Sequence, residues 1–319
     1  MSSLLTIVIG TRNRLDILKK CLNALIGEIK ASHKIIVVDA GSTDGTIEYL
    51  SSLKKVKLIC DGKPIGQAKS LNRIFRTLNS KYVCWLSDDN VPKPFIFDLA
   101  IGILEVKNDI GMIALKVKDV KGPFTNEPYI GGIHATGILN CNQGIIRNKL
   151  LKKIGYFDEA FKNYGIDPDL TARVLLSGSK VAYTKKLAIE HYRDHESETA
   201  AISQSERSNG INSAEIIYNT KYASLIKSTF NQKLVASIKR ILWFLIRKYK
   251  RKLKKKKSSF ELFLGKNMKD WLNLTHCRYI SIFDFWKNRK KPYYLVQHIP
   301  NLKFHNSRII NSDRYKGKE

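Results

Sequence analysis

The sequence predicts an α/β fold: a Rossmann-like, mostly parallel sheet with helices on both faces, followed by a basic, mainly helical C-terminal extension. The first two thirds of the chain alternate short β-branched runs with longer amphipathic stretches, the pattern of parallel strands joined by helices. Hydrophobic residues make up 43% and charged residues 26% of the 319 residues, which excludes a collagen-like or wholly disordered chain. This length fits one large α/β unit with an appendage, or two domains.

Short apolar runs give the expected strands and the stretches between them give the expected helices. The strands are predicted at residues 4–9, 34–39, 56–60, 82–86 and 112–117. The helices are predicted at residues 16–29, 42–53 and 66–78, and the second of these opens with Ser-Thr-Asp-Gly, a capping and turn signal. Residues 120–145 are rich in Gly, Pro and Asn, so we expect loops near a site there.

Positive charge is concentrated at the end of the chain. The 56 Lys and Arg residues exceed the 28 Asp and Glu residues, giving a net charge of +28, and 24 of the basic but only 5 of the acidic residues lie in residues 231–319. We therefore expect an α/β domain over residues 1–200 and a basic, mostly helical region over residues 201–319. A polyanionic partner, either an anionic membrane surface or nucleic acid, is expected for the second region.

Residues 234–257 have the composition of a helix that lies on a membrane surface. Apolar residues recur at helical spacing from Leu234 to Leu253, and nine of the eleven residues 247–257 are Lys or Arg. We expect this segment to dock on an anionic leaflet, although a solvated lysine run is the simpler alternative. Nucleic acid is the less favoured partner, because neither recognition-motif aromatics nor metal fingers accompany the lysines.

The spacing of the cysteines and the lengths of the apolar runs indicate the cellular compartment of the protein. The five cysteines are odd in number, widely spaced and free of CxxC pairs, which favours reduced thiols over a disulfide framework or a zinc site. The first apolar run is too short for a secretory signal, and the longest, residues 241–246, is far below the ~20 residues of a spanning helix. We expect a cytoplasmic protein, peripheral on the cytosolic face of the membrane.

Acidic residues end two of the predicted strands. Asp88 and Asp89 follow the strand at residues 82–86, Asp39 ends the strand at 34–39, and Thr11 follows the first strand. Because the carboxyl ends of parallel strands meet at one edge of a sheet, these residues should converge on one crevice. Paired carboxylates suit Mg²⁺ or Mn²⁺ bridging a diphosphate, and Asp39 could hold a base or ribose. Each acid could instead cap the turn or helix that follows it.

Six short motifs occur in order between residue 4 and about residue 195. They are TIVIGTRNR at 6–14, IVVDAGSTDGT at 36–46, GQAKSLN at 66–72, WLSDDNVPKP at 85–94, GYFDE at 155–159 and GIDPDLTAR at 165–173. Each motif is modest alone, but the ordered set resembles glycosyltransferase family two, the inverting nucleotide-sugar transferases with the GT-A fold. The resemblance implies that fold for this chain.

The resemblance also implies a role for each matching residue. Asp167 matches the catalytic base, Asp89 matches the direct metal ligand, and His191 resembles a histidine that helps to hold metal or diphosphate. The implied donor-binding residues are Thr11, Arg12, Asp39, Lys69, Asn72 and Asp88. Two alternatives stay open: Asp167 could cap the helix at residues 170–176, and His191 could be an ordinary surface or core histidine.

The sequence departs from the family pattern at three functional positions. Ser87 replaces the first acid of the metal motif, so the two following carboxylates must suffice. Ile166 replaces a frequent acid just before the implied base. Leu71 stands where an arginine often meets phosphate, and Lys69 or Arg73 could substitute for it. These changes leave catalysis plausible but do not identify the sugar.

The resemblance thus implies a Mn²⁺- or Mg²⁺-dependent inverting glycosyltransferase of the hexosyl type. It would move a sugar from a nucleoside-diphosphate sugar, with UDP the commonest nucleotide, to a hydroxyl of a growing cell-surface glycan or lipid-linked saccharide. The alternative is a catalytically silent nucleotide-binding module that its basic tail anchors to membrane or nucleic acid. A nucleotidyltransferase is not favoured, because residues 10–13 are too poor in glycine for a phosphate-binding loop.

Overall fold

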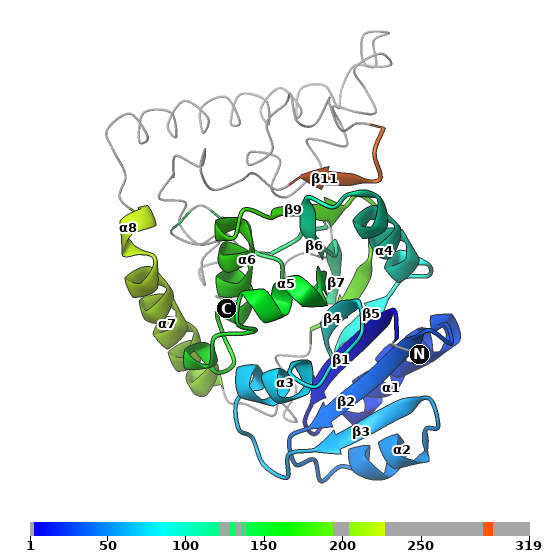
Figure 1. Cartoon of the computed structure of the whole chain (residues 1–319). Helices are drawn as coiled ribbons and strands as arrows, with labels where there is room; N and C mark the ends of the chain where they lie inside the picture. The colour runs from blue at the N-terminus through cyan, green and yellow to red at the C-terminus, as the bar shows by residue number, and fades with distance from the viewer. Residues whose placement is uncertain are drawn as a thin grey trace, which may run out of the picture.

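An eight-stranded mixed sheet forms the centre of the molecule (Figure 1). The computed structural model describes residues 3–121, 125, 128–131, 136, 138–193, 204–226 and 290–295. The strand order is β11-β9-β6-β8-β4-β1-β2-β3. The strands are β1 (Leu5–Thr11), β2 (His33–Asp39), β3 (Val56–Cys60), β4 (Tyr82–Ser87), β6 (Ile110–Ala114), β8 (Gly144–Arg147), β9 (Lys180–Thr184) and β11 (Tyr293–Leu295). Only β8 and β11 run antiparallel to their neighbours in this sheet, so the predicted mostly parallel α/β fold is confirmed.

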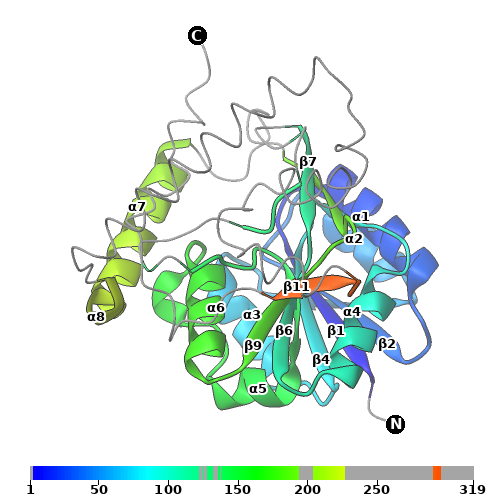
Figure 2. The same cartoon turned by 90° about the horizontal axis from the view of Figure 1, so that it is seen from above.

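Helices cover both faces of this sheet (Figure 2). They are α1 (Leu15–Glu28), α2 (Thr46–Ser52), α3 (Gln67–Phe75), α4 (Ile96–Val106), α5 (Asn148–Lys153) and α6 (Ile166–Leu176). Successive strand residues point to opposite faces, so Val8 packs with α3 and α6 while Ile7 and Ile9 pack with α1 and α4. The sheet therefore has a hydrophobic core on each side, and its strands read as continuous apolar runs.

A second, three-stranded sheet has the order β5-β10-β7. Its strands are β5 (Asn90–Pro92), β10 (Ile189–Tyr192) and β7 (Val117–Lys121). The single strand predicted at residues 112–117 is wrong, because the chain leaves the large sheet after Ala114 and enters the small one at Val117. Lys116 lies at the crossing, where its N–H donates to Thr184 Oγ1 (3.0 Å) and its carbonyl accepts from Ala188 N (2.9 Å).

The core extends past the boundary expected at residue 200. Helix α7 (Gln204–Lys221) lies beside α6 and is followed by the short α8 (Ala223–Ile226) (Figure 1). Tyr218 and Tyr222 are buried in the cluster that contains α3 and α6. The hydroxyl of Tyr222 donates to Asp169 Oδ1 (2.7 Å), and Lys221 Nζ lies 2.7 Å from the same oxygen. The first part of the predicted C-terminal region thus completes the α/β core.

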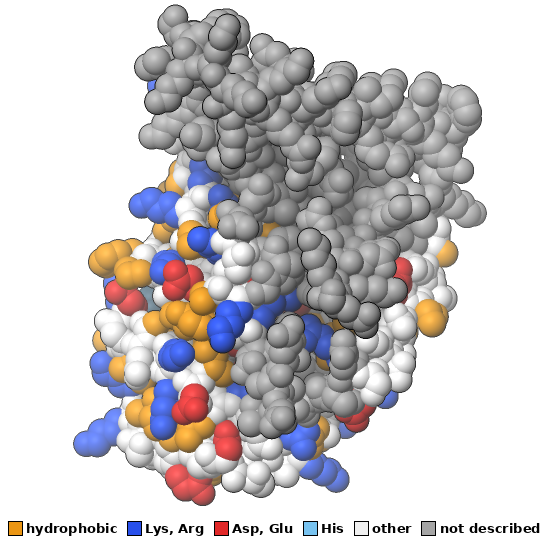
Figure 3. All heavy atoms as spheres, turned by 180° about the vertical axis from the view of Figure 1, so that it is seen from behind, with side chains coloured by type: hydrophobic (Ala, Val, Ile, Leu, Met, Phe, Trp, Pro, Cys, Tyr) orange, Lys and Arg blue, Asp and Glu red, His pale blue; other side chains and the backbone are white. Residues whose placement is uncertain are grey.

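The basic segment predicted at residues 234–257 lies outside the described residues. Within the described part of the chain, no helix combines the length and the apolar character needed to cross a membrane. On the face drawn in Figure 3, lysine and arginine side chains of described residues are spread over the surface with acidic side chains among them. On this face of the described residues, basic and acidic side chains are therefore mixed.

Tyr222→Phe should lower the free energy of unfolding by about 1–2 kcal/mol, because it removes a buried hydrogen bond to the ionisable Asp169 while keeping the ring. Urea denaturation measures this change. Tyr49→Phe is the matched control, since among the described residues the hydroxyl of Tyr49 has no hydrogen-bond partner, and it should leave stability nearly unchanged. Equal effects in the two variants would show that the Tyr222 hydroxyl does not secure α7.

Candidate active site

Two buried carboxylates at the end of β4 form the centre of the site. β1 pairs in parallel with β4, so the end of β1 lies beside them. Thr11 Oγ1 donates to Asp88 Oδ2 (2.8 Å). Arg14 donates from Nη1 to Asp88 Oδ1 (2.7 Å) and from Nη2 to Asp89 Oδ2 (3.1 Å). The predicted convergence of Thr11, Asp88 and Asp89 is therefore found, and Arg14 joins them although the sequence interpretation gave it no role.

Asp39 shapes the turn that follows β2. Its side chain is fully buried; Oδ1 accepts from the N–H groups of Gly41 (2.9 Å) and Ser42 (2.8 Å), and Oδ2 accepts from Ser42 Oγ (2.5 Å). Gly41 has a φ of +87°, and a Cβ there would lie 2.5 Å from the carbonyl oxygen of Gly62, so only glycine fits. Asp39 therefore stabilises the turn that follows it, as one of its two expected roles requires. Its contact with ribose stays a prediction.

The small sheet brings His191 to the carboxylates. β10 pairs antiparallel with β5, the strand that directly follows Asp89, so His191 lies opposite Asn90. His191 Nε2 lies 3.3 Å from Asp89 Oδ2, and its Nδ1 lies 3.1 Å from Asp119 Oδ1 on β7. Burial lowers the pKa of His191, but the hydrogen bonds to Asp119 and Asp89 outweigh it and the net shift is upward. The two residues that the resemblance implies as metal-binding thus lie side by side, and metal binding stays a prediction.

Asp119 supports His191 from behind. It is almost fully buried, and it accepts from the Tyr129 hydroxyl (2.9 Å) and pairs with Arg193 Nε (2.9 Å). Burial raises the pKa of Asp119, but the hydrogen bond from His191 and the charge of Arg193 hold it below its usual range. An ionised carboxylate on Nδ1 fixes the imidazole so that Nε2 faces Asp89. The sequence interpretation missed Asp119 because it did not identify β7 as a separate strand.

The two carboxylates of β4 differ electrostatically. Burial raises the pKa of Asp88, and the negative charge of Asp89 raises it further, although the guanidinium of Arg14 opposes both. Burial would also raise the pKa of Asp89, but the hydrogen bond and charge of His191, with the charge of Arg14, hold it well below its usual range. Asp89 is therefore the member of the pair that ionises more readily.

Asp89 and His191 fit a divalent cation that a diphosphate also contacts. Asp89 Oδ1 is buried and has no hydrogen-bond partner among the described residues. A carboxylate oxygen with an imidazole nitrogen suits Mn²⁺ or Mg²⁺ when phosphate oxygens complete the shell. In the described ranges no group of three or more His, Cys, Asp or Glu side chains could hold a metal alone, so this site would depend on the donor. Asp88 is less suited, because Thr11 and Arg14 occupy both its oxygens.

Asp167 lies in the first turn of α6 and faces β4. Trp85 Nε1 donates to Asp167 Oδ1 (3.0 Å) and also to the carbonyl oxygen of Asn142 (3.2 Å). Burial raises the pKa of Asp167 to about 8, and the Trp85 hydrogen bond opposes this shift. The cap position is Gly165, without a side-chain cap bond, so Asp167 does not cap the helix. A carboxyl group with a raised pKa is typical of an acid–base group.

Asn72 and Lys69 do not contact the carboxylate pair. Asn72 is fully buried; Nδ2 donates to the Phe157 carbonyl (2.8 Å) and Glu159 Oε1 (3.0 Å), and Oδ1 accepts from Phe157 N (2.9 Å). The amide therefore fixes the loop before α6. Lys69 is exposed on α3. Their donor contacts stay predictions.

Two arginines complete the set considered from sequence. Arg12 is partly exposed, and its buried Nε has no hydrogen-bond partner among the residues that the structure describes. Arg73, the alternative phosphate contact to Lys69, pairs with Asp61 after β3. Arg12 is thus better placed than Arg73 to accept a new anionic partner.

Comparison with known proteins identifies the chain's relatives. Residues 6–129 match the model of glycosyl transferase family 2. An uncharacterized glycosyltransferase of Haemophilus influenzae is 26% identical over 110 residues, covering 33% of this chain and 34% of that protein. Another from Nostoc sp. is 22% identical over 170 residues, covering 47% of this chain and 52% of that protein. The matches thus span about a third and about half of the two relatives.

The fold comparison agrees with the sequence matches. Residues 1–349 of TarS from S. aureus, crystallised with UDP-GlcNAc, share the fold with a TM-score of 0.53 and 17% identity, covering 64% of this chain and 62% of that one. The resemblance that the ordered motifs predict is confirmed by the family match, the curated relatives and this shared GT-A fold. The matches thus support glycosyl transferase family 2 for this chain, with the family model covering residues 6–129.

Proposed function

We propose that this chain is a metal-dependent inverting glycosyltransferase that moves a hexose from a nucleoside-diphosphate sugar to a hydroxyl of a glycan or lipid-linked acceptor. The observation that carries this proposal is that β4 links two chemically distinct acids. Its end bears the ionised Asp89, and its Trp85 contacts Asp167, whose pKa is raised to about 8. One acid suits a cation and the other suits proton transfer. UDP is the first nucleotide to test, since TarS was crystallised with UDP-GlcNAc.

The donor would lie at the carboxyl edge of the large sheet. Its proposed contacts are Thr11, Arg12, Asp39, Lys69, Asn72 and Asp88, with Asn72 acting through the loop that it fixes. Asp89 and His191 would hold Mn²⁺ or Mg²⁺ beside the diphosphate. When bound, that cation would neutralise the charge that develops on the leaving diphosphate. The unpartnered Asp89 Oδ1 supports this placement.

Asp167 would serve as the general base. The acceptor oxygen attacks the anomeric carbon, the bond from that carbon to the diphosphate oxygen breaks, and the hydroxyl proton moves to the Asp167 carboxylate. A single displacement of this kind inverts the anomeric centre. Only ionised Asp167 can accept the proton, so kcat should rise with pH, reach half its maximum near the Asp167 pKa of about 8 and level off above it.

Asp167→Asn should lower kcat by about a hundredfold to ten-thousandfold, because the amide cannot accept the proton. Donor affinity, measured by calorimetry, should change less than about twofold, since Asn keeps the shape and the bond from Trp85. Asp98→Asn, at a partly exposed ion pair with Lys30, is the matched control and should keep wild-type turnover. Near-normal turnover of Asp167→Asn would refute the assignment of the base.

We also propose that residues 234–257 attach the enzyme to an anionic membrane surface, which would bring lipid-linked acceptors within reach. This proposal rests on the sequence, because these residues lie outside the described ones. Each basic residue near such a surface contributes about 1 kcal/mol, which salt screens. The competing reading is the catalytically silent module, in which this attachment would be the main property of the chain.

The full chain should float with phosphatidylserine-containing vesicles and not with pure phosphatidylcholine vesicles. Replacing the nine basic residues of 247–257 by Gln should abolish flotation while leaving the apolar stripe in place. High salt should weaken the wild-type interaction. Undiminished flotation of the Gln variant would exclude this segment as the membrane contact.

A further inference from the structure

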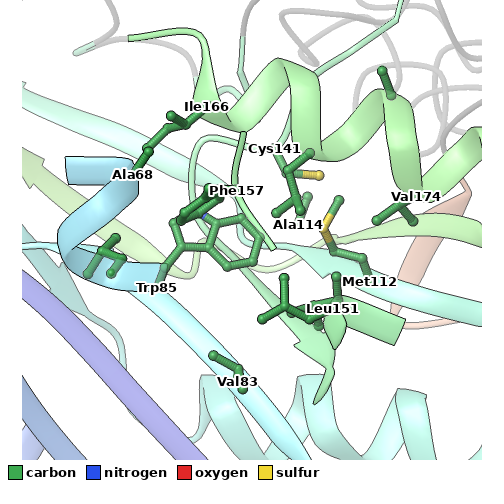
Figure 4. Packing of buried hydrophobic residues seen from close by; sticks show 14 of the residues in the cluster. Ala68, Val83, Trp85, Met112, Ala114, Cys141, Leu151, Phe157, Ile166 and Val174 are labelled. Carbon is green, nitrogen blue, oxygen red and sulfur yellow. The ribbon is translucent and has the colours of Figure 1, made fainter. Parts of the chain in front are cut away.

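The only polar side-chain atom of Trp85 points at the proposed base. Nε1 lies 3.0 Å from Asp167 Oδ1 and 3.2 Å from the carbonyl oxygen of Asn142, so its N–H donates to two acceptors. The side chain is 3% exposed. Its ring meets the ring of Phe157 edge to face, with centroids 6.0 Å apart, and Ile166 at the start of α6 lies close by (Figure 4). A buried indole N–H normally has such a partner.

The surrounding sequence leaves the indole little freedom. Trp85 pairs with Val8 of β1 on one side and with Gly144 of β8 on the other. A Cβ at Gly144 would lie 2.7 Å from the carbonyl oxygen of Ile113 and 3.0 Å from the indole, so glycine at this position makes room for the ring. Packing against β1 and β8 therefore fixes the direction of the indole N–H.

Trp85 is the one described residue whose side chain hydrogen-bonds the Asp167 carboxylate, and no described Lys, Arg or His forms an ion pair with it. The bond takes Oδ1. Oδ2 has no hydrogen-bond donor among the described residues and is the oxygen left to accept a proton. A carboxylate without this bond would rotate about its Cβ–Cγ bond and lose the distinction between its two oxygens.

We propose that Trp85 is a positioning residue: its indole N–H holds Asp167 Oδ1 so that Oδ2 meets the acceptor hydroxyl. This inference rests on the proposed function and deepens it. Because Asp88 and Asp89 directly follow the strand that contains Trp85, β4 sets the base relative to the carboxylates that face the donor. The strand thereby couples the position of the proton acceptor to that of the leaving group.

The hydrogen bond from Trp85 affects the pKa of Asp167 in a defined direction. A donor to the ionised carboxylate stabilises that form, so it lowers the Asp167 pKa below the value that burial alone would give. Among the described residues, the Cys141 thiol from the segment before β8 also interacts with Asp167, and burial raises its pKa so that it stays neutral. Asp169 on the same helix is paired with Arg173 and Lys221. Losing the indole N–H should therefore move the Asp167 titration to higher pH.

Nuclear magnetic resonance of the ¹⁵N-labelled indoles tests the contact without turnover. The chain has four tryptophans, and the Trp85 signal is the one missing in Trp85→Phe. In wild type this signal should shift with pH, with a midpoint near the Asp167 pKa of about 8. It should not shift over that range in Asp167→Asn. A pH-independent Trp85 signal in wild type, or an unchanged titration in Asp167→Asn, would overturn the proposal.

Kinetics test the consequence for the reaction. Trp85→Phe keeps a ring and removes the N–H, and it should lower kcat by about tenfold to a hundredfold, the range for a lost hydrogen bond to a charged group. Its kcat profile should level off at higher pH, while the KM for the donor changes less than about twofold. A wild-type pH profile in folded Trp85→Phe would contradict the positioning role.

Phe157→Leu is the matched control, because it disturbs the packing of the indole and leaves the N–H in place. Its pH profile should match wild type. An equal displacement of both profiles would mean that packing, and not the hydrogen bond, sets the position of Asp167. Absence of sugar transfer by the wild-type chain would overturn the proposed function alone, because the indole titration reports the contact independently of turnover.

Discussion

Parallel pairing of β1 with β4 is the constraint on which the site depends. Gly10 pairs with Ser87, so the residues that follow this pair, Thr11 and Asp88, emerge at the same edge of the sheet. The pairing places Thr11 against Asp88 and gives Arg14 access to both carboxylates. Both strands are buried on two faces, which forces the acids to enter a desolvated environment. Strand register therefore determines where the side chains of the site lie.

Burying two adjacent acids requires nearby positive charge. Arg14 and His191 supply it, and the small sheet exists at the right place to hold His191, since β5 continues directly from Asp89. Asp119 and Arg193 then balance His191 from the outer side. An arrangement of this kind is costly to break, because removing one member leaves another charge buried without a partner. It also keeps Asp89 ionised, as a cation ligand must be.

Asp167, the other acid of the proposed site, has a different electrostatic environment. Asp167 has no ion-pair partner among the described residues, so burial dominates and its pKa rises to about 8. Trp85 moderates that rise through a single neutral hydrogen bond. Two acids near one strand thus have opposite shifts in pKa for identifiable reasons, which is the usual way in which one site provides both a fixed charge and a proton acceptor.

The sequence predicted β1 to β4 of the large sheet, because they are apolar runs separated by amphipathic helices and strong turn signals. It did not predict β8, β9 or β11 of that sheet. It did not predict β5 or β10, which are only three and four residues long, or the change of sheets near Lys116. Asp89 and His191, each implied by the resemblance as a metal residue, lie 3.3 Å apart, and their role toward a metal stays a prediction. Arg14, Asp119 and Trp85 were missed because their roles arise from register and sheet pairing, which residue type and spacing do not encode.

The most direct test of this account is nucleotide release by the purified chain from a panel of UDP-, GDP- and dTDP-sugars, with Mn²⁺ or with a chelator. Wild type should release nucleotide from one donor only when Mn²⁺ is present, and Asp89→Ala should lose that response, because Asp89 is the ionised acid with an open oxygen. Metal-independent release, or full release by Asp89→Ala, would contradict the metal site. No release from any donor would favour the catalytically silent module.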